Sequence, residues 1–367
     1  MTFRWGILGT GPVSRKFVLG LRSISGVSLS AVAANRIDSA RRFADDFKIP
    51  VVADGVEDLT RRADIDAVYV ATPASLHRDH AIACIEAGKP VLVEKPFATS
   101  RADAEAIADA SRAHGVFCME GIWTQFLPLV TELVRRVEAG EIGRVRSFSG
   151  SFGVPNATDM SKSIFQPELG GGALLHRGIY PLSLARRLLG PVVEQTSMAV
   201  VGDTGVDEDC VLVLRHEGGG VSTVSAGLRS ALANDMTVTG DQGVIHVSAP
   251  IYRPFRMTVT RTPIQAMAGG GAQRFEGLKE GGSLQGAQQR LFGLTRLIRG
   301  RRSKTVFRPY SGNGYHYEAT ELMDGVRAGR TESPTLSLGV SVELAGVIEQ
   351  ARTSWSQRAS DARREGR

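Results

Sequence analysis

A lysine at the tip of a predicted strand is the residue with the clearest capacity for chemistry. The segment Lys89–Phe97 reads Lys-Pro-Val-Leu-Val-Glu-Lys-Pro-Phe, with an apolar run between two prolines. This run predicts a buried strand of a parallel sheet that ends at Glu94 and Lys95. Ligands of open α/β sheets bind outside the carboxyl ends of the strands, so Lys95 is a candidate catalytic residue that faces a crevice. An ordinary strand end with a solvated Glu94–Lys95 pair is the alternative.

A glycine-rich turn follows the first predicted strand, near Phe3–Leu8, and precedes a helical pattern that reaches Leu21. The turn is Gly9, Thr10, Gly11, Pro12, Val13 and Ser14. Gly9 permits a tight turn, and Gly11 lets a pyrophosphate approach the backbone, while Ser14 supplies a small residue where a third glycine is usual. The helix N-terminus favours anions. This order of strand, turn and helix predicts a dinucleotide site.

The end of the second predicted strand distinguishes two cofactors. An acidic residue about 20 positions after the glycine turn would bond the ribose 2′-hydroxyl of NAD. The sequence has Asn35 and Arg36 there instead. A guanidinium pairs with a phosphate in a bidentate manner, which suits the 2′-phosphate of NADP. We therefore expect NADP, with NAD as the weaker alternative, and a plain surface role for Arg36 stays open.

Length and composition are those of a water-soluble globular protein with two domains. The chain has 367 residues, of which 42% are hydrophobic and 22% charged, and no run is long and apolar enough for a membrane helix. The net charge is +6 and only 6% of residues are aromatic. The basic excess lies in Arg296–Lys304 and in the C-terminal residues from Arg358 onward, not in a stripe with interleaved aromatics, which argues against nucleic-acid binding.

Cysteine and histidine usage bears on compartment and metal binding. The three cysteines, Cys84, Cys118 and Cys210, are scattered through apolar patterns, so we expect reduced core residues and a cytoplasmic protein. The N-terminus enters a strand directly, without the layout of a signal peptide. The seven histidines lack the spacing of metal ligands, and no metal is expected.

Alternating strands and helices predict the architecture of the first domain. Five such units within about 120 residues imply a doubly wound, parallel α/β Rossmann domain over residues 1–121. From Gly143 onward, longer strands alternate apolar and polar residues, which predicts an α+β domain over 122–352 with an open, mostly antiparallel sheet. A helix over 172–189 is expected to cover one face, and the other face is a predicted oligomer surface. Residues 264–304 look like an insertion, and 353–367 like a polar tail.

Several segments, taken together, resemble the Gfo/Idh/MocA oxidoreductases, and within them the dimeric dihydrodiol dehydrogenase and D-xylose dehydrogenase branch. The resemblance covers nearly the whole chain apart from the apparent insertion. The segments that carry it are the glycine turn at 9–14, Ala-Thr-Pro-Ala-Ser-Leu-His at 71–77, Glu-Ala-Gly-Lys-Pro-Val-Leu-Val-Glu-Lys-Pro at 86–96, Met-Glu-Gly-Ile-Trp-Thr-Gln-Phe at 119–126, Gly-Gly-Gly-Ala-Leu-Leu-His-Arg-Gly-Ile-Tyr-Pro at 170–181, Gly-Asn-Gly-Tyr-His-Tyr-Glu at 312–318 and Gly-Arg-Thr-Glu-Ser at 329–333.

The resemblance implies roles for three catalytic candidates. Lys95 matches the active-site lysine of the family, and Tyr180 matches the acid/base of that branch. His176 stands where the family usually has an aspartate, and Arg177 follows it. We therefore expect two cationic groups in place of an acid, which makes an anionic substrate or a loss of activity conceivable. With an ordinary pKa near 6.5, His176 is a second candidate proton carrier.

The matching segments also suggest which residues contact the cofactor. Besides the glycine turn, Asn35 and Arg36, these are Thr72, Pro73, His77, Glu94, Lys95 and Trp123. His77, at the start of a helix, is the one for which we favour a structural role. For Trp123 and Phe126, core packing is an equal alternative to lining the pocket.

The expected function is NADP-linked hydride transfer between the cofactor and a secondary alcohol or carbonyl of a small sugar-like or diol substrate. A positioned acid/base, here Tyr180 with Lys95, contributes roughly 10² to 10⁴-fold to such reactions. An NAD-linked inositol-type dehydrogenase is the first alternative, and Arg36 argues against it. A non-catalytic dinucleotide-binding sensor or scaffold is the second, and Lys95 with Tyr180 argues against that.

Overall fold

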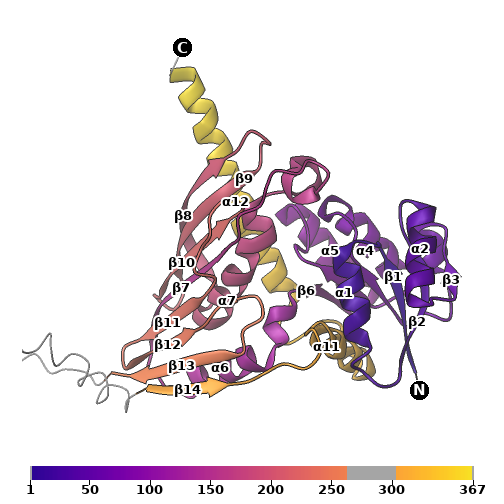
Figure 1. Cartoon of the computed structure of the whole chain (residues 1–367), viewed down its shortest axis with the longest axis horizontal. Helices are drawn as coiled ribbons and strands as arrows, with labels where there is room; N and C mark the ends of the chain where they lie inside the picture. Colours follow the sequence, from indigo (N-terminus) through magenta and orange to yellow (C-terminus); the bar gives the residue numbers. More distant parts are fainter. Residues whose placement is uncertain (1, 263–302, 366–367) are drawn as a thin grey trace, which may run out of the picture.

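The chain forms two sheets, one parallel and one mostly antiparallel, with helices between and around them (Figure 1). The structure is a computed structural model and describes residues 2–262 and 303–365. The predicted fold class is confirmed. The predicted insertion at 264–304 lies outside the described residues except for its last two positions.

The first sheet has the strand order β3-β2-β1-β4-β5-β6, and all its pairs are parallel. Its strands β4 and β5 are buried over their whole length because helices cover both faces. The strands are β1 (Phe3–Leu8), β2 (Val27–Ala33), β3 (Val51–Val52), β4 (Ala67–Val70), β5 (Val91–Glu94) and β6 (Cys118–Gly121). The helices are α1 (Pro12–Leu21), α2 (Ile37–Phe47), α3 (Gly55–Thr60), α4 (His77–Glu86) and α5 (Arg101–His114).

The second sheet has the order β14-β13-β12-β11-β7-β10-β9-β8. Among the described strands, β7 and β10 form its one parallel pair, and the remaining neighbours are antiparallel. The strands are β7 (Val145–Gly153), β8 (Val192–Val201), β9 (Asp207–His216), β10 (Val221–Gly227), β11 (Met236–Gly240), β12 (Gly243–Val247), β13 (Arg256–Arg261) and β14 (Ser303–Phe307). The helices of this half are α6 (Pro128–Glu138), α7 (Ile179–Leu189), α11 (His316–Arg327) and α12 (Leu338–Glu365).

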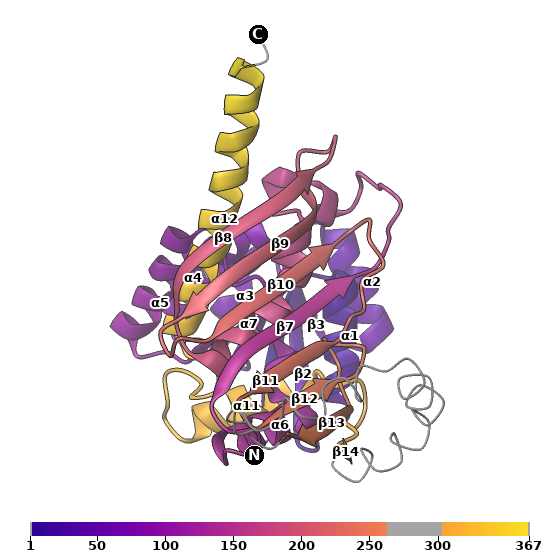
Figure 2. The ribbon, with the colours of Figure 1, turned by 90° about the vertical axis from the view of Figure 1, so that its left-hand side faces the viewer.

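Alternation along the strands decides which face of the second sheet is covered. In β9, Cys210, Leu212 and Leu214 are buried, whereas Val211 and Val213 are exposed. The buried face packs against α7 and α12, and Figure 2 shows the opposite face turned to the viewer with no described helix over it. Because buried and exposed residues alternate along the strand, the described helices cover one face of this sheet and leave the other open.

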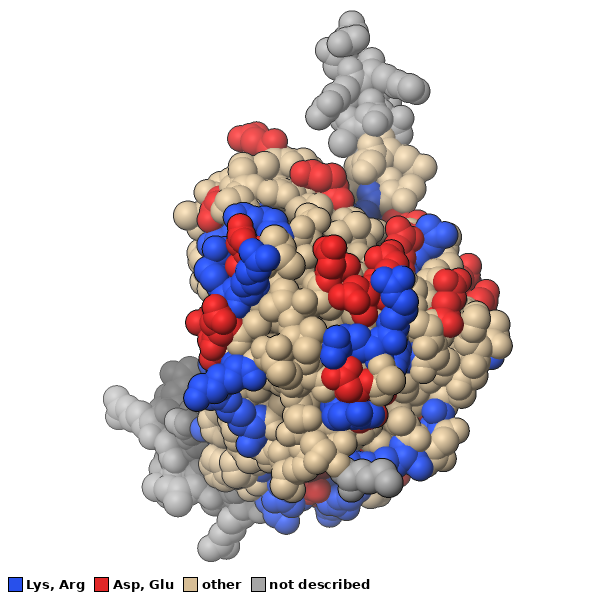
Figure 3. All heavy atoms as spheres, turned by 90° about the vertical axis from the view of Figure 1, so that its right-hand side faces the viewer, with Lys and Arg blue, Asp and Glu red and all other residues tan. Residues whose placement is uncertain are grey.

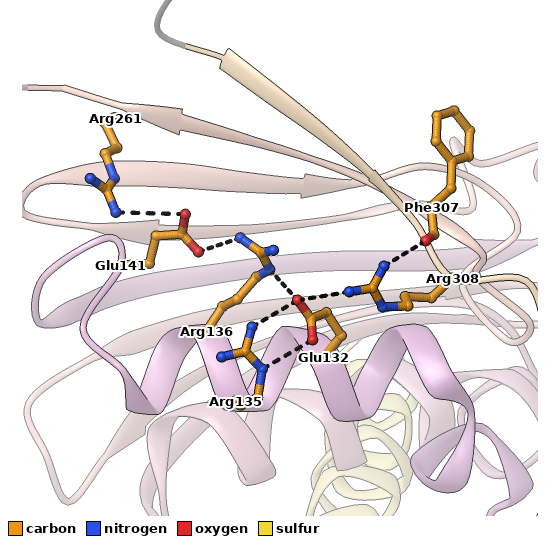
Figure 4. Close-up of polar contacts among 7 residues, drawn as sticks. All are labelled: Glu132, Arg135, Arg136, Glu141, Arg261, Phe307 and Arg308. Atoms are coloured by element: carbon orange, nitrogen blue, oxygen red, sulfur yellow. Dashed lines mark hydrogen bonds and ion pairs between the residues drawn. The ribbon is translucent and has the colours of Figure 1, made fainter.

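Ion pairs connect α6 and the turn after it to the edge of the second sheet that β13 and β14 form (Figure 4). Glu132 accepts from Arg136 at 2.7 Å, and Arg136 also contacts Glu141 at 2.5 Å. Arg261, at the end of β13, lies 3.7 Å from Glu141, and Arg308, just after β14, lies 3.5 Å from Glu132. Arg136 is buried, so its two carboxylate partners are needed to compensate for lost hydration.

Three predictions about elements need correction. Strand β14 was not predicted, because it begins inside the glycine-rich, basic segment 264–304, whose composition does not indicate a strand. The helix expected over 172–189 is divided into a π-helical turn, Leu174–Gly178, and α7. Residues 353–365, predicted as part of a polar tail, continue α12 as one helix to Glu365. A polar composition does not prevent helix formation when the residues themselves favour helices.

The surface of the first domain carries both signs of charge. Figure 3 shows Lys and Arg side chains intermixed with Asp and Glu on the side of the molecule that this domain forms. No stripe of one sign crosses the part of that face that the structure describes.

Candidate active site

A cavity of about 860 Å³ lies at the carboxyl ends of the parallel strands. The strand order reverses between β1 and β4, which is where open α/β sheets bind ligands. The β1–α1 turn, the end of β2 and the segments after β4 and β5 border the cavity. Ser163, Leu169 and His176 of the second domain also line it. The size is that of an ordinary ligand pocket.

The glycine turn is built for close approach to a phosphate. Gly9 has φ +104°, and a Cβ there would lie 2.4 Å from the Ala71 carbonyl oxygen, so only glycine fits. Gly11 caps α1 and Pro12 occupies its first turn, which contains no acidic residue. The free N–H groups and the helix dipole therefore favour an anion. Thr10, Gly11, Pro12 and Val13 all border the cavity, as predicted for this turn.

Asn35 and Arg36 border the cavity at the end of β2, and both are exposed. Arg36 caps α2 with an extended backbone, and none of the described carboxylates forms an ion pair with it. Its guanidinium is thus available to an anionic ligand. Glu57, on α3, borders the same end of the cavity.

His77 joins the loops that follow β4 and β5. Its Nδ1 lies 2.8 Å from the Pro96 carbonyl oxygen and its Nε2 lies 2.9 Å from the Thr72 carbonyl oxygen. The ring is buried, and burial lowers the pKa of His77 to about 4. Thr72 and Pro73 border the cavity beside it. Because a neutral imidazole carries one N–H, His77 donates to only one of these two carbonyl oxygens, and its ring lies between the two loops.

Lys95 directly follows β5, and its side chain points toward the second domain. Its Nζ donates to the His176 carbonyl oxygen at 3.1 Å and lies 5.5 Å from the centre of the Tyr180 ring. Burial lowers the pKa of Lys95, and the carboxylates of Glu94 and Glu120 oppose that shift. The solvated Glu94–Lys95 pair is excluded, because Glu94 is buried.

Tyr180 and Trp123 are buried beside the cavity, next to Lys95, and neither is among the residues that line it. Trp123 Nε1 donates to the Tyr180 hydroxyl at 3.4 Å, and Trp123 stacks on Tyr315 with ring centres 4.7 Å apart. Tyr180 also packs edge-on against Phe152. Burial, and next the charge of Glu94, raise the pKa of Tyr180, so its phenol stays protonated. The structure therefore brings Lys95 and Tyr180 together, but it places Trp123 against Tyr180 and away from the cavity border.

The two potentially cationic residues at 176 and 177 do not face the cavity together. His176 borders the cavity, yet burial, and next the charge of Lys95, lower its pKa to about 3, so it is neutral near neutral pH. Arg177 turns away from the cavity and donates to the carbonyl oxygens of Val154 and Gly227 and to the side chain of Asn156. Arg177 therefore does not contribute its charge to the cavity, and these two residues give no support to an anionic substrate.

Three buried acids lie near Lys95, and of these the sequence analysis named Glu94 but overlooked Glu120 and Glu318. Glu94 accepts from the Tyr69 hydroxyl at 2.8 Å and from Lys95 N at 3.0 Å. Glu120, on β6, accepts from Phe97 N at 2.9 Å, and burial raises its pKa to about 7. Glu318, on α11, is fully buried. The sequence did contain a signal for Glu120 and Glu318. Glu120 lies inside the apolar strand pattern at 118–121, and Glu318 ends the Tyr-His-Tyr-Glu segment at 315–318.

Other site types find no support among the described residues. No group of three or more His, Cys, Asp or Glu side chains in residues 2–262 and 303–365 could hold a metal ion. None of the helices traced there is long and apolar enough to cross a membrane.

A phosphate-binding turn, a lysine at a strand tip and an open second sheet together define a dinucleotide-binding oxidoreductase of two domains. The comparisons agree. Residues 3–122 match the oxidoreductase family model with an NAD-binding Rossmann fold, and residues 130–246 match the Gfo/Idh/MocA C-terminal domain. The chain belongs to the Gfo/Idh/MocA oxidoreductase family, as the sequence motifs predicted.

Curated relatives and solved structures match almost the full length. A trans-1,2-dihydrobenzene-1,2-diol dehydrogenase of Bos taurus is 29% identical over 96% of both chains, and one of Xenopus tropicalis is 27% identical over 96% of this chain and 97% of its own. A 3-ketoreductase from Actinomadura kijaniata, in complex with NADP and TDP-benzene, superposes with a TM-score of 0.76 at 24% identity, covering 96% of this chain and 98% of its own. Levoglucosan dehydrogenase, in complex with NADH and levoglucosan, gives 0.79 at 20% identity and covers 98% of both chains. These two structures are similar in fold.

Proposed function

We propose that the protein is an NADP-dependent oxidoreductase that moves a hydride between the cofactor and a secondary alcohol or carbonyl of a small sugar-like or diol substrate. The observation that carries this proposal is the approach of Lys95 Nζ to within 5.5 Å of the Tyr180 ring, at the end of a cavity that begins at the glycine turn. A cation can stabilise negative charge on a reacting oxygen, and a phenol can donate a proton to that oxygen.

The cofactor site fits a dinucleotide on grounds of this structure. Gly9 and the first turn of α1 would hold the pyrophosphate, because a side chain at position 9 would collide with Ala71 and no acid repels an anion there. Asn35 and Arg36 would hold the 2′-phosphate of NADP, since a guanidinium without an acidic partner favours that group. Thr72, Pro73, Glu94 and Lys95 would line the path toward the nicotinamide.

The cofactor, when bound, supplies or accepts the hydride. The protonated Tyr180 hydroxyl would give its proton to the oxygen of a carbonyl substrate, and Lys95 Nζ would stabilise the negative charge on that oxygen. In the oxidation direction the step runs in reverse: the Tyr180 phenolate would accept the hydroxyl proton, and Lys95 Nζ would stabilise that phenolate beforehand. Neutral His176, on the cavity wall, would accept or donate a hydrogen bond to a second hydroxyl.

The relatives support the substrate class. Those named trans-1,2-dihydrobenzene-1,2-diol dehydrogenase act, by their name, on a diol, and levoglucosan dehydrogenase acts on a sugar derivative. Because the levoglucosan dehydrogenase structure contains NADH, an NAD-linked inositol-type dehydrogenase is retained as the first alternative. A non-catalytic dinucleotide-binding sensor or scaffold protein is the second.

We further propose that the protein forms a homo-oligomer through the uncovered face of the second sheet. Met198 on β8 and Val211 on β9 are direct cross-strand neighbours on that face, with 75% and 45% of their surface exposed. Val200 and Val213 continue the apolar strip. Extended apolar faces of this kind mark protein–protein contacts.

The test is a screen for NADP⁺ reduction over aldoses, sugar acids, inositols and diols, repeated with NAD⁺. We expect turnover of a neutral diol or sugar with NADP⁺. A protein that binds NADPH tightly but turns over none of these would support the sensor alternative, and turnover with NAD⁺ alone would overturn the cofactor assignment.

A further inference from the structure

A buried aspartate of the second sheet binds the start of the turn that contacts Lys95. Asp207, the first residue of β9, is only 4% exposed. Its Oδ2 accepts from the backbone N–H of Leu174 at 2.7 Å. Leu174 is the first residue of the π-helical turn Leu174–Gly178. Because the N–H groups in the first turn of a helix have no acceptor within that helix, the carboxylate satisfies a donor that would otherwise be unpaired.

Gly172, two residues before Leu174, leaves the space that this carboxylate occupies. Its backbone has φ +122°, and a Cβ built there would collide with Asp207 Oδ1. Any other residue at position 172 would be strained in this conformation and would also displace the carboxylate. The backbone before the turn thus has the shape that lets an acid of β9 reach the Leu174 N–H.

The hydrogen bond from Leu174 also favours the charged form of Asp207. Burial raises the pKa of Asp207 to about 6, and the Leu174 N–H opposes this rise more strongly than the charge of Arg352 on α12 does. Asp207 is therefore ionised near neutral pH. A hydrogen bond to an ionised acceptor is roughly twice as strong as one between neutral groups. The bond that joins β9 to the turn is consequently a strong one.

The same turn provides the acceptor that directs Lys95. The His176 carbonyl oxygen, two residues after Leu174, accepts from Lys95 Nζ at 3.1 Å. In a π-helical turn a carbonyl oxygen accepts from the fifth residue along the chain, and for His176 that residue is Pro181, which has no N–H. No bond of this kind competes with Lys95 for the oxygen. Tyr180, on α7, follows the turn, so the position of the turn affects both Lys95 and the ring it faces.

We propose that Asp207 is a positioning residue for hydride transfer: it fixes the turn at 174–178, and through the His176 carbonyl oxygen it fixes Lys95 opposite Tyr180. The inference rests on the proposed function and deepens it. Asp207 is not among the residues that line the cavity, so it acts through the backbone of the turn. A misplacement of about 1 Å between reacting groups can lower a rate roughly 10²-fold. The loss of this one bond should therefore be measurable in catalysis.

Hydrogen exchange, measured by mass spectrometry without substrate or cofactor, tests the anchoring. Asp207→Ala removes the acceptor of the Leu174 N–H, whereas Asp207→Asn keeps an amide oxygen in its place. We expect the amides of residues 173–180 to exchange about 10-fold faster in Asp207→Ala than in the wild type, and within about 3-fold of the wild type in Asp207→Asn. Unchanged exchange in Asp207→Ala overturns the proposal, whether or not the protein turns over any compound of the substrate screen.

Gly172→Ala is the second variant, for the case that Asp207→Ala does not fold. It retains the acid but places a methyl group against Asp207 Oδ1. We expect the same faster exchange of residues 173–180 in this variant. Exchange at the wild-type rate would show that the turn does not depend on the approach of Asp207, and would likewise overturn the proposal.

Steady-state kinetics separate positioning from a merely structural role. Asp207→Ala is expected to lower kcat about 10- to 100-fold, with the NADPH dissociation constant within about 2-fold of the wild type, because the glycine turn and Arg36 belong to the first domain. Asp207→Asn is expected to restore kcat to within about 3-fold of the wild type, because its amide oxygen can still accept from Leu174. A parallel fall of kcat and of the number of NADPH sites per chain would show loss of folded protein and contradict the proposal.

Asp241→Ala is the matched control. Asp241 Oδ1 also accepts from a backbone N–H of the second domain, that of Arg144 at 3.1 Å, but Asp241 does not contact the turn at 174–178. This variant should retain the wild-type kcat and the wild-type exchange of residues 173–180. Equal kcat values in Asp207→Ala and Asp241→Ala would contradict the proposal.

Discussion

The ammonium of Lys95, just after β5, lies 5.5 Å from the centre of the phenol ring of Tyr180 on α7, although the two residues belong to different domains. The Lys95 side chain is held in this direction by its hydrogen bond to the carbonyl of His176. Tyr180 is held from its other side by the indole of Trp123. Both groups are thus fixed before any ligand enters, which is the condition for electrostatic preorganisation.

Lys95→Met is expected to abolish turnover while NADPH still binds. Methionine keeps much of the length of the side chain but removes the charge that stabilises the reacting oxygen, and we expect kcat to fall by about 10² or more. Steady-state kinetics and fluorescence titration with NADPH measure the two effects separately. Unchanged turnover in this variant would remove Lys95 from the mechanism.

Arg36→Ala is expected to weaken NADPH binding far more than NADH binding. Hydrogen bonds to charged groups contribute about 1.5–3 kcal/mol each, which corresponds to roughly a 10- to 100-fold loss for NADPH. Titration of both cofactors measures the ratio. Glu57→Gln, at the same end of the cavity, is the control and should not weaken NADPH. Equal losses for the two cofactors in Arg36→Ala would contradict the NADP assignment.

Met198→Glu is expected to yield a smaller oligomer than the wild type. Met198 lies on the uncovered sheet face, and a carboxylate placed in an apolar interface has no compensating partner. Size-exclusion chromatography with light scattering measures the mass. Leu19→Glu, at a residue 46% exposed on α1, controls for added surface charge. If Met198→Glu and wild type have the same mass, the interface lies elsewhere.

Glu120→Gln is expected to change how stability depends on pH. The folded protein holds the pKa of Glu120 at about 7, above its ordinary value of 4.5, so the native state binds more protons than the unfolded state between these values. Glu120 therefore destabilises the fold progressively as the pH rises from about 4.5 to 7, by up to about 3 kcal/mol. Glutamine cannot ionise, so the variant gains stability relative to wild type over this range.

Urea unfolding of the two proteins at about pH 5 and pH 8 measures this difference. The variant should match the wild type most closely at the lower pH, provided that its amide oxygen still accepts from Phe97 N. A gap between the two free energies of unfolding that stays constant with pH would show that Glu120 is ionised throughout.

Local patterns were sufficient to predict the first domain. The alternation of apolar strands with helices, the glycine turn before α1 and the strand that ends at Lys95 are all encoded within short windows, and the structure has each of them. The strand tips converge because parallel strands with right-handed crossovers bring their carboxyl ends to one edge. The predicted cofactor contacts except Trp123 consequently border one cavity.

The charges of the site could not be predicted from the sequence. His176 and Arg177 are adjacent and both basic, but their surroundings depend on the π-helical turn, which sets the His176 carbonyl oxygen against Lys95 Nζ and directs Arg177 to the carbonyl oxygens of Val154 and Gly227. The burial of Glu318 likewise depends on contact with β6, about 200 residues earlier in the chain. Such long-range contacts leave no periodic signal in the sequence.

Helix α12 contacts both halves of the molecule, and this limits how they can move. Glu349 accepts from Arg101 N at the start of α5, Glu343 pairs with Arg186 of α7 at 2.7 Å, and Trp355 donates to Ser197 of β8. A hinge rotation that carries α12 with the second domain would break the Arg101–Glu349 bond, and one that carries it with the first domain would break the bonds of Glu343 and Trp355. Because either movement removes bonds of α12, substitutions along this helix should alter the distance from Lys95 to Tyr180 although they lie away from the cavity.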